Sequence, residues 1–401
     1  MDQEDKEERL CANPKKGTNQ VAVGNYNERL VLQLVREHGE LSKAEATRAT
    51  GLSANAISVI FRSLEADGLL LRGEPIRGRV GAPSTPLRIN PLAHSYVALK
   101  IGRRSMELAV VNFMGEVVTS KEMFQPFPTP ATTLRFVQDE LQDLLCSAKR
   151  TCKAISGMAI AMPFELWHWT DDFDAPAEEM EAWQDFDAER EIGKIVPWEV
   201  VLENDATAAC RAEVVFGSHA DKQDWIYFYV GTFIGGGIVL NGHVFRGRRG
   251  NAGGFGPMRV PDQEGGNRLV DHASLVTLER MVLDITGRSF SPYEASDDWG
   301  RFEPLVSDWI TRAGRNLAHA VISSLSIIDF EAVIIDGAMP TEVTGRLVSE
   351  VISQLQQTDL QGVLMPEVEA GTFGRQARTI GAAATLVSAA YLPEQNTLLS
   401  G

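Results

Sequence analysis

Apolar side chains near the start of the chain recur at the spacing of amphipathic helices. The first stripe predicts a helix that begins at residue 27 and ends at Gly39, and its apolar face consists of Leu30, Val31, Leu34 and Val35. Residues 1–21 are polar and highly charged, so a disordered tail is expected there.

Two short helices are predicted next, on either side of a turn at residues 50–52. Ser42 and Glu45 have the spacing of a capping box, and Gly51 supplies the left-handed residue that ends this helix. Ser53 is the expected N-cap of the following helix, which runs to about residue 67. Its apolar stripe consists of Ile57, Ile60, Phe61 and Leu64.

These two helices indicate a helix-turn-helix unit, whose second helix would enter the major groove of DNA. Strands predicted at residues 69–71 and 87–89 enclose a Gly- and Pro-rich hairpin, which is typical of a wing that touches the DNA backbone or minor groove. A three-helix packing module without a DNA role is the alternative. The candidate DNA-contacting residues are Lys43, Ser53, Asn55, Ala56, Ser58, Arg62, Arg77 and Arg79.

From about residue 94 the pattern alternates between strands and helices, which predicts an α/β body of two lobes. The acidic segment 171–191, which contains Trp183 and Phe186, is expected to be a solvated surface with a short helix. Strands are predicted at residues 96–102, 106–113, 117–120, 154–161, 200–204, 225–230, 238–241 and 332–336, and helices at 132–150, 206–215, 302–328, 341–357 and 379–390.

A glycine-rich run at residues 231–237 joins two of the predicted strands. Because a strand and not a helix follows it, the run is predicted to be a hairpin and not a dinucleotide-binding fingerprint. Glycines at such a place allow a phosphate group or another strand to approach the backbone closely.

The composition of the 401 residues, 44% apolar and 23% charged, is that of a globular chain rather than a disordered one. No apolar run has the roughly 18 residues of a membrane helix, and the charged N-terminus lacks the apolar core of a secretory signal. The four cysteines have no CxxC spacing, so a disulfide scaffold is not expected and the cytoplasm is the expected location.

The net charge of −16 is unevenly distributed along the chain. Residues 25–90 hold nine Lys or Arg against seven Asp or Glu, a net +2, whereas residues 91–401 carry −17. The acidity of the body therefore does not exclude DNA as a partner of the N-terminal segment.

Taken together in order, these motifs resemble the ROK family of repressors, open reading frames and kinases, from about residue 22 to 392. The resemblance is carried by the segments 41–53 and 78–84 near the N-terminus and by the segments 203–206, 231–239, 250–256 and 334–337 in the body. It implies an α/β fold in which a winged helix-turn-helix precedes an actin-like, sugar-kinase-like body. The expected domains are 22–90 for the winged unit, 94–205 with about 378–395 for the first lobe, and 206–377 for the second lobe.

The chain departs from the family's kinases at three nucleotide-site positions. Lys100 stands where the kinases have a metal-binding aspartate, and an ammonium group cannot ligate Mg²⁺. Phe233 is expected to crowd a phosphate, and Asp336 is expected to place a negative charge where the nucleotide would lie. Kinase activity is therefore not expected. The remnants of the nucleotide site are Gly102, Gly231, Thr232, Gly235 and Gly337.

Asp205 matches the kinases' general base, and it can still accept hydrogen bonds from a sugar hydroxyl. The alternative is that Asn204 and Asp205 only cap the helix that follows. The chain has Gly254, Pro257 and Val270 where the family usually has sugar-binding Glu and His residues, so a modified sugar, an acidic sugar or another metabolite is possible. The expected ligand-binding residues are Pro163, Asn204, Asp205, Asn251, Gly253 and Gly254.

The resemblance and its departures predict a DNA-binding transcriptional regulator, a repressor by family expectation, that acts as a homodimer. Its body would sense a carbohydrate-type metabolite. The family's zinc-binding cysteine cluster is absent, so neither a metal nor a cofactor is expected. An ATP-dependent sugar kinase with a regulatory head is one alternative, and a regulator whose body is only a dimerisation scaffold is another.

Overall fold

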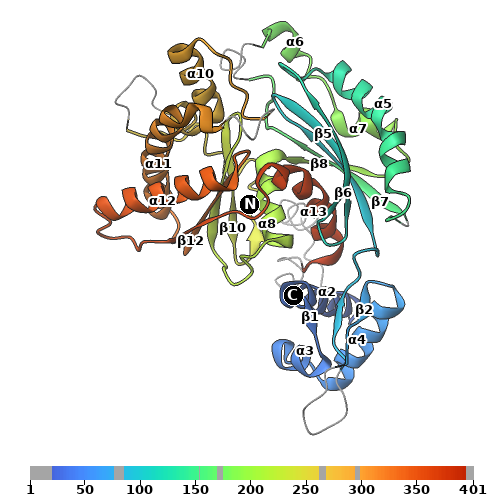
Figure 1. The fold of residues 1–401 in the computed structure, drawn as a ribbon. Helices are drawn as coiled ribbons and strands as arrows, with labels where there is room; N and C mark the ends of the chain where they lie inside the picture. Colours follow the sequence, from blue (N-terminus) through green and yellow to red (C-terminus); the bar gives the residue numbers. More distant parts are fainter. Residues whose placement is uncertain are drawn as a thin grey trace, which may run out of the picture. The chain divides into compact units, whose positions relative to one another are not determined.

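The computed structural model describes residues 20–75, 85–152, 154–168, 175–261, 268–293 and 299–393. The chain divides into two compact units, of which one comprises Met1–Ala93 with Val387–Gly401 and the other His94–Leu386 (Figure 1). Residues 378–395 were expected in the body, but those from Val387 onward group with the N-terminal unit. Within that unit, Arg29 Nη1 donates a hydrogen bond to the Leu392 carbonyl oxygen (3.3 Å).

Among residues 20–75 and 85–93, the N-terminal unit has three helices and a small antiparallel sheet. The helices are α2 (Gln20–His38), α3 (Lys43–Thr50) and α4 (Ala54–Ala66), and the strand order is β1 (Glu40–Leu41), β3 (Leu87–Ile89) and β2 (Leu70–Arg72). Helix α2 begins earlier than predicted, inside the segment expected to be a tail. Residues 76–84, the tip of the predicted wing, lie outside the described residues.

The predicted caps of the two short helices are present. The Ser42 backbone N–H donates to Glu45 Oε2 (2.9 Å) while Glu45 N donates to Ser42 Oγ (3.3 Å), which completes the capping box. Gly51 has a φ of 69°, and Ala56 N donates to Ser53 Oγ (3.2 Å). The stripe Ile57, Ile60, Phe61 and Leu64 is buried, as its spacing predicted.

The first sheet of the body has the order β6 (Val117–Phe124), β5 (Ser105–Asn112), β4 (Ser95–Ile101), β7 (Ile155–Met162) and β8 (Val200–Asn204). Strands β4 to β6 are antiparallel neighbours, and β7 and β8 run parallel to β4. Apolar residues of α5 (Pro130–Ala148) and α7 (Ala188–Gly193) pack on one face, together with Met180 of α6 (Ala177–Glu181).

Trp183 corrects the expectation that the acidic segment is solvated. Its side chain is only 2% exposed, and its indole N–H donates to the Pro128 carbonyl oxygen (3.0 Å). The Phe186 ring packs edge-on against it, with 5.4 Å between centroids. Trp183 and Phe186 thus pack in the core of the first sheet.

The second sheet has the same topology, with the order β11 (His243–Val244), β10 (Ile234–Leu240), β9 (Trp225–Val230), β12 (Ala332–Gly337) and β13 (Glu367–Ala370). Alternate residues of β9 face opposite sides, as a strand requires. Ile226, Phe228 and Val230 join the core formed with the second lobe's helices. These helices are α9 (Val270–Ala273), α10 (Leu275–Thr286), η2 (Trp299–Phe302), α11 (Glu303–Leu325) and α12 (Thr341–Gln357).

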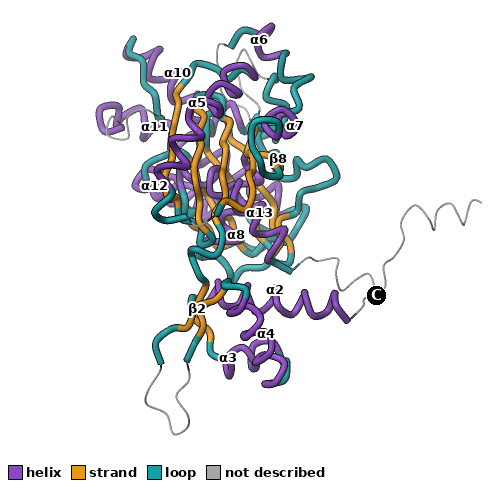
Figure 2. The backbone as a smooth tube through the Cα atoms, turned by 90° about the vertical axis from the view of Figure 1, so that its right-hand side faces the viewer, coloured by secondary structure: helices purple, strands orange, loops and turns teal. Residues whose placement is uncertain are grey.

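Two helices, α8 (Asp205–Phe216) and α13 (Ala377–Tyr391), pack on the other face of β9, against Trp225 and Tyr227. Figure 1 shows both helices between the two sheets of the body. In Figure 2 the strands of the body form its centre, with helices on both sides. The short helix η3 (Gly374–Gln376) leads into α13 and brings its first turn close to α8.

Residues 231–233 connect β9 to its antiparallel neighbour β10, which confirms the predicted hairpin. Gly235, Gly236 and Gly237 lie within β10, which begins at Ile234 and not at residue 238 as predicted. The reason is close packing between layers. A Cβ atom on Gly235 would lie 2.9 Å from Ala206 Cβ, and one on Gly237 would lie 2.7 Å from Cys210 Sγ, both on α8. The glycines therefore let a helix approach the strand. Among the described residues, no helix is both long and apolar enough to cross a membrane.

Candidate ligand-binding site

A cavity of about 210 Å³ lies in the body, where β7 and β8 end and α8 begins. All six predicted ligand-binding residues line it, together with Thr232 and Gly235 of the predicted nucleotide-site remnant. Gly102, Gly231 and Gly337, the other three remnant positions, do not line it. The predicted residues come from the ends of β7 and β8 and from the loop after β11: Pro163, Asn204, Asp205, Asn251, Gly253 and Gly254.

Asn204 and Asp205 have different roles at the start of α8. The Asn204 side-chain oxygen accepts a hydrogen bond from Thr207 N (3.0 Å), so Asn204 is the N-cap of α8. Asp205 Oδ2 instead accepts a hydrogen bond from Arg378 Nη1 at 3.1 Å. The helix-capping alternative therefore describes Asn204, whereas the Asp205 carboxylate is turned to a cation across the cavity.

Arg378 was not among the predicted site residues. It lies in the first turn of α13, is 7% exposed, and its guanidinium carbon lies 5.0 Å from the centroid of the Tyr229 ring. A cation in the first turn opposes the helix dipole, so its position in the sequence was a signal that it needs an anionic partner. Burial raises the pKa of Tyr229 to about 12, so the phenol in this wall of the cavity stays protonated.

Arg103 and Phe233 form another wall of the cavity. Arg103 Nη1 donates to the carbonyl oxygens of Leu166 (2.8 Å) and His168 (3.2 Å). Its guanidinium carbon lies 4.8 Å from the centroid of the Phe233 ring, within cation–π distance. An aromatic face of this kind, beside hydrogen-bonding groups, suits the apolar face of a sugar ring.

Lys100 lies in a second cavity of about 270 Å³, which Arg378 also lines. The Lys100 ammonium is buried and donates to Ser105 Oγ (2.7 Å). Burial, followed by the nearby Arg378 charge, lowers the pKa of Lys100 to about 8. The position therefore holds a cation at neutral pH, where a carboxylate would be needed to ligate Mg²⁺.

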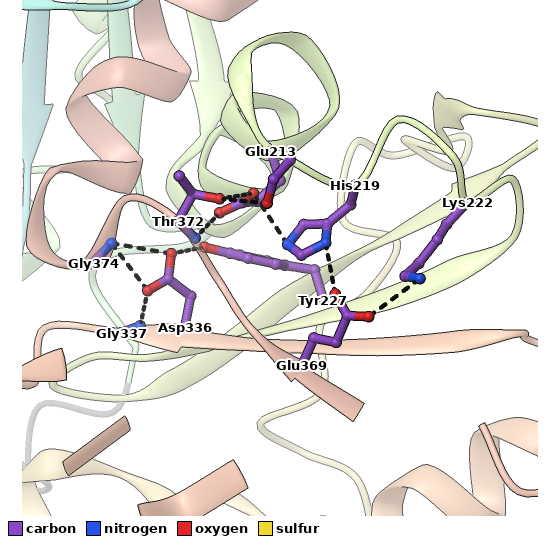
Figure 3. Close-up of polar contacts among 10 residues, drawn as sticks. Glu213, His219, Lys222, Tyr227, Asp336, Gly337, Glu369, Thr372 and Gly374 are labelled. Atoms are coloured by element: carbon purple, nitrogen blue, oxygen red, sulfur yellow. Dashed lines mark hydrogen bonds and ion pairs between the residues drawn. The ribbon is translucent and has the colours of Figure 1, made fainter. Parts of the chain in front are cut away.

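Asp336 differs from the expectation that its charge would face a nucleotide. The carboxylate is 1% exposed and accepts hydrogen bonds from Tyr227 Oη (3.0 Å), Gly337 N (2.7 Å) and Gly374 N (3.0 Å) (Figure 3). Burial raises the pKa of Asp336. Asp336 therefore ties the end of β12 to the η3 turn.

In the N-terminal unit, the predicted DNA-contacting residues lie mostly at the surface of α3 and α4. Lys43, Ser53, Asn55 and Arg62 are exposed, and Ala56 and Ser58 are half-buried. Arg77 and Arg79 lie outside the described residues. Val59, which is 52% exposed and was not among the predicted residues, lies on the same helix face, because it stands four residues after Asn55 and three before Arg62.

Among the described residues, no group of three His, Cys, Asp or Glu side chains is placed to hold a metal ion. The two similar sheets, the helices between them and the cavity at the strand ends define a mixed α/β body of the actin-like, sugar-kinase-like class.

The chain belongs to the ROK family, whose sequence model matches residues 96–389. The N-acetylglucosamine repressor of Escherichia coli O6:H1 is 22% identical in an alignment 338 residues long, and the alignment covers 79% of this chain and 81% of the repressor. Two solved structures are similar in fold. A ROK family transcriptional regulator, a homologue of the E. coli MLC protein, has a TM-score of 0.66 and 21% identity, and the match covers 94% of this chain and 98% of that one. A ROK glucokinase from Streptomyces griseus, in complex with glucose and AMPPNP, has a TM-score of 0.57 and 21% identity over 73% of this chain and 98% of its own.

Proposed function

We propose that this chain is a DNA-binding transcriptional regulator, acting as a repressor, whose body senses a sugar or a related small metabolite. Its N-terminal unit would be a winged helix-turn-helix, and the molecule would act as a homodimer in the cytoplasm. The repressor among its relatives supports this proposal.

The exposed face of α4 is the observation that supports the DNA-binding part of the proposal. Asn55, Val59 and Arg62 lie on that face, opposite the buried stripe that anchors the helix. Asn pairs with adenine, Arg with guanine or phosphate, and an apolar group with the thymine methyl, so the three side chains match the chemistry of a major groove. Dimerisation would place two such helices in half-sites about one helical turn apart.

The sensing part is supported by the cavity beside Asp205. It combines a carboxylate, the Asn204 and Asn251 amides and the aromatic Phe233. Ligand bound there would change the free energy of DNA binding only by its differential affinity for two conformations, typically about 1–3 kcal/mol or 5- to 150-fold in DNA affinity.

Sensing is favoured over phosphoryl transfer for two reasons. Lys100 cannot ligate a metal ion, and the Asp205 carboxylate is held by Arg378 instead of being free to take a proton from a sugar hydroxyl. We therefore expect no sugar-dependent ATP turnover. Turnover that the Asp205→Asn variant loses would overturn this part of the proposal.

The decisive experiment is a titration of the full chain onto DNA fragments from its own upstream region, with and without a panel of sugars. We expect specific binding that one compound changes. Arg62→Ala should weaken binding, and if Arg62 contacts phosphate it should also lower the slope of log affinity against log salt by about one.

Asn55→Ala should instead weaken binding only to the preferred sequence, by about 5- to 100-fold. Arg135→Ala is the matched control, because it removes the same charge from the exposed face of α5 in the body. Unchanged specific binding in both α4 variants would show that α4 is not the recognition helix.

A further inference from the structure

The second cavity gathers charged side chains from several elements of the body. Lys100 comes from β4, Glu107 and Glu122 from β5 and β6, Arg375 from η3 and Arg378 from α13. Cations thus outnumber carboxylates in its lining. The proposed sensing function does not yet assign a role to this cavity.

Two of these cations converge although both are buried. Lys100 is 3% exposed and Arg378 is 7% exposed, and the Gly102 backbone lies beside both of them. A Cβ atom at Gly102 would lie 3.5 Å from Arg378 Nη1 and 3.7 Å from Lys100 Cε. Two positive charges held so close in a poorly solvated place repel each other unless an anion lies between them.

Three carboxylates, those of Glu107, Glu122 and Asp205, match the three cations in number, but none of them lies at hydrogen-bond distance from the Lys100 ammonium. Glu122 Oε1 lies 3.8 Å from Lys100 Nζ and 3.6 Å from Arg375 Nη2, which is longer than a charge-assisted hydrogen bond. Glu107 accepts a hydrogen bond from Thr379 Oγ1, and Asp205 is paired with Arg378 in the first cavity. The Lys100 ammonium therefore donates to one neutral hydroxyl, that of Ser105, and to no carboxylate at hydrogen-bond distance within the described residues.

We propose that the second cavity binds an anionic oxygen group, a carboxylate or a phosphate, of the ligand whose uncharged part occupies the cavity beside Asp205. Arg378 lines both cavities and so connects the two parts of the site. Lys100 and Arg378 would both donate to the anionic group. This inference rests on the proposed function and narrows the ligand class to acidic or phosphorylated sugars.

The test is calorimetric titration of the full chain with matched sets of compounds: each neutral hexose or N-acetylhexosamine, its uronic acid, and its 6-phosphate. At least one charged compound should bind at least 10-fold more tightly than its neutral parent. Tighter binding of the uronic acid would identify the anionic group as a carboxylate, and tighter binding of the 6-phosphate would identify it as a phosphate. Inorganic phosphate alone is titrated as a separate probe.

Lys100→Met should abolish this 10-fold preference, whereas Lys100→Arg should retain most of it. Lys121→Met is the matched control, because Lys121 lies on β6, is 40% exposed and pairs with Glu140. Because Lys100 is buried, its substitution could disturb folding, so Arg375→Gln provides a second variant at a side chain that is 36% exposed. Arg375→Gln should weaken binding of the charged compound more than binding of the neutral one.

Several outcomes would overturn the inference: equal binding of neutral and charged compounds, a preference that Lys100→Met leaves unchanged, or Lys100-dependent binding of inorganic phosphate without any sugar derivative. Binding of wild type and Lys100→Met to DNA is measured in parallel without ligand. Intact DNA binding in both separates a failure of this inference from a failure of the proposed function.

Discussion

Asp205 and Arg378 form an ion pair, and their side chains are 13% and 8% exposed, respectively. A buried ion pair contributes little net stability, but removing one partner leaves the other charge buried without compensation. The pair therefore fixes the first turn of α13 against the first turn of α8, and it orients the carboxylate that faces the ligand.

Asp205→Asn should lower the free energy of unfolding by about 3 kcal/mol, because the Arg378 charge would lose its anion. Urea unfolding of the two proteins measures this difference. Glu303→Gln is the control, since Glu303 pairs with Arg346 at the surface, with exposures of 51% and 33%, and should cost less than about 1 kcal/mol. Equal costs for the two substitutions would contradict a buried, uncompensated charge.

At the scale of elements, the glycine run has two roles, because residues 231–233 connect β9 to β10 and the remaining glycines lie within β10. Gly235 and Gly237 carry no side chain on the face that α8 covers, so the helix can lie close to the strand, whereas Gly236 faces Phe255 on the other side. Gly237 is the clearest case, because any side chain there would meet Cys210.

Gly237→Ala should lower the free energy of unfolding by about 1–3 kcal/mol through overpacking. Combining it with Cys210→Ala should restore only the part of the loss that is due to Sγ, because the Cys210 Cβ atom, 2.5 Å from the added methyl group, remains. Thermal or urea unfolding measures both variants. Gly345→Ala is the control on α12, where nothing lies within 4 Å of the added methyl group, and it should stabilise by up to about 1 kcal/mol. If Gly237→Ala behaved like Gly345→Ala, close packing would not explain the run.

Local signals predicted most elements, and the failures have physical reasons. The capping box at Ser42 and the stripe of α4 were readable because capping and helical periodicity depend on residues within a few positions. The glycine run has no side-chain periodicity, so its strand was assigned too short. The Asp205–Arg378 pair joins residues 173 positions apart, and no local pattern reports a contact of that range.

At the scale of the whole molecule, the buried carboxyl of Glu213 links stability to pH. Glu213 lies on α8 and accepts a hydrogen bond from Thr372 Oγ1 (2.9 Å), and His219 Nε2 lies 3.6 Å from it (Figure 3). Burial, with a further contribution from the nearby Asp336 charge, raises the pKa of Glu213 to about 7. The folded protein therefore binds a proton at Glu213 that the unfolded chain releases above its ordinary pKa of about 4.5.

This proton stabilises the folded state below pH 4.5, and its contribution is lost as the pH rises to about 7. The shifted pKa of Glu213 alone would correspond to a loss of about 3 kcal/mol. Burial lowers the pKa of His219, which changes stability in the opposite sense, so the net loss should be on the order of 2 kcal/mol. Glu213→Gln should flatten the dependence of the unfolding free energy on pH between 4.5 and 7. Glu303→Gln should leave the pH dependence of the unfolding free energy unchanged over this range. If Glu213→Gln retained the wild-type slope, Glu213 would not be the group that titrates.

Helix α13 begins beside the ligand cavity, yet its last turn, from Val387, belongs to the same unit as helices α2, α3 and α4. The boundary between the units therefore cannot be made with a single cut in the polypeptide. A fragment of residues 94–401 would retain the Leu392 carbonyl oxygen but lose Arg29, which donates a hydrogen bond to it.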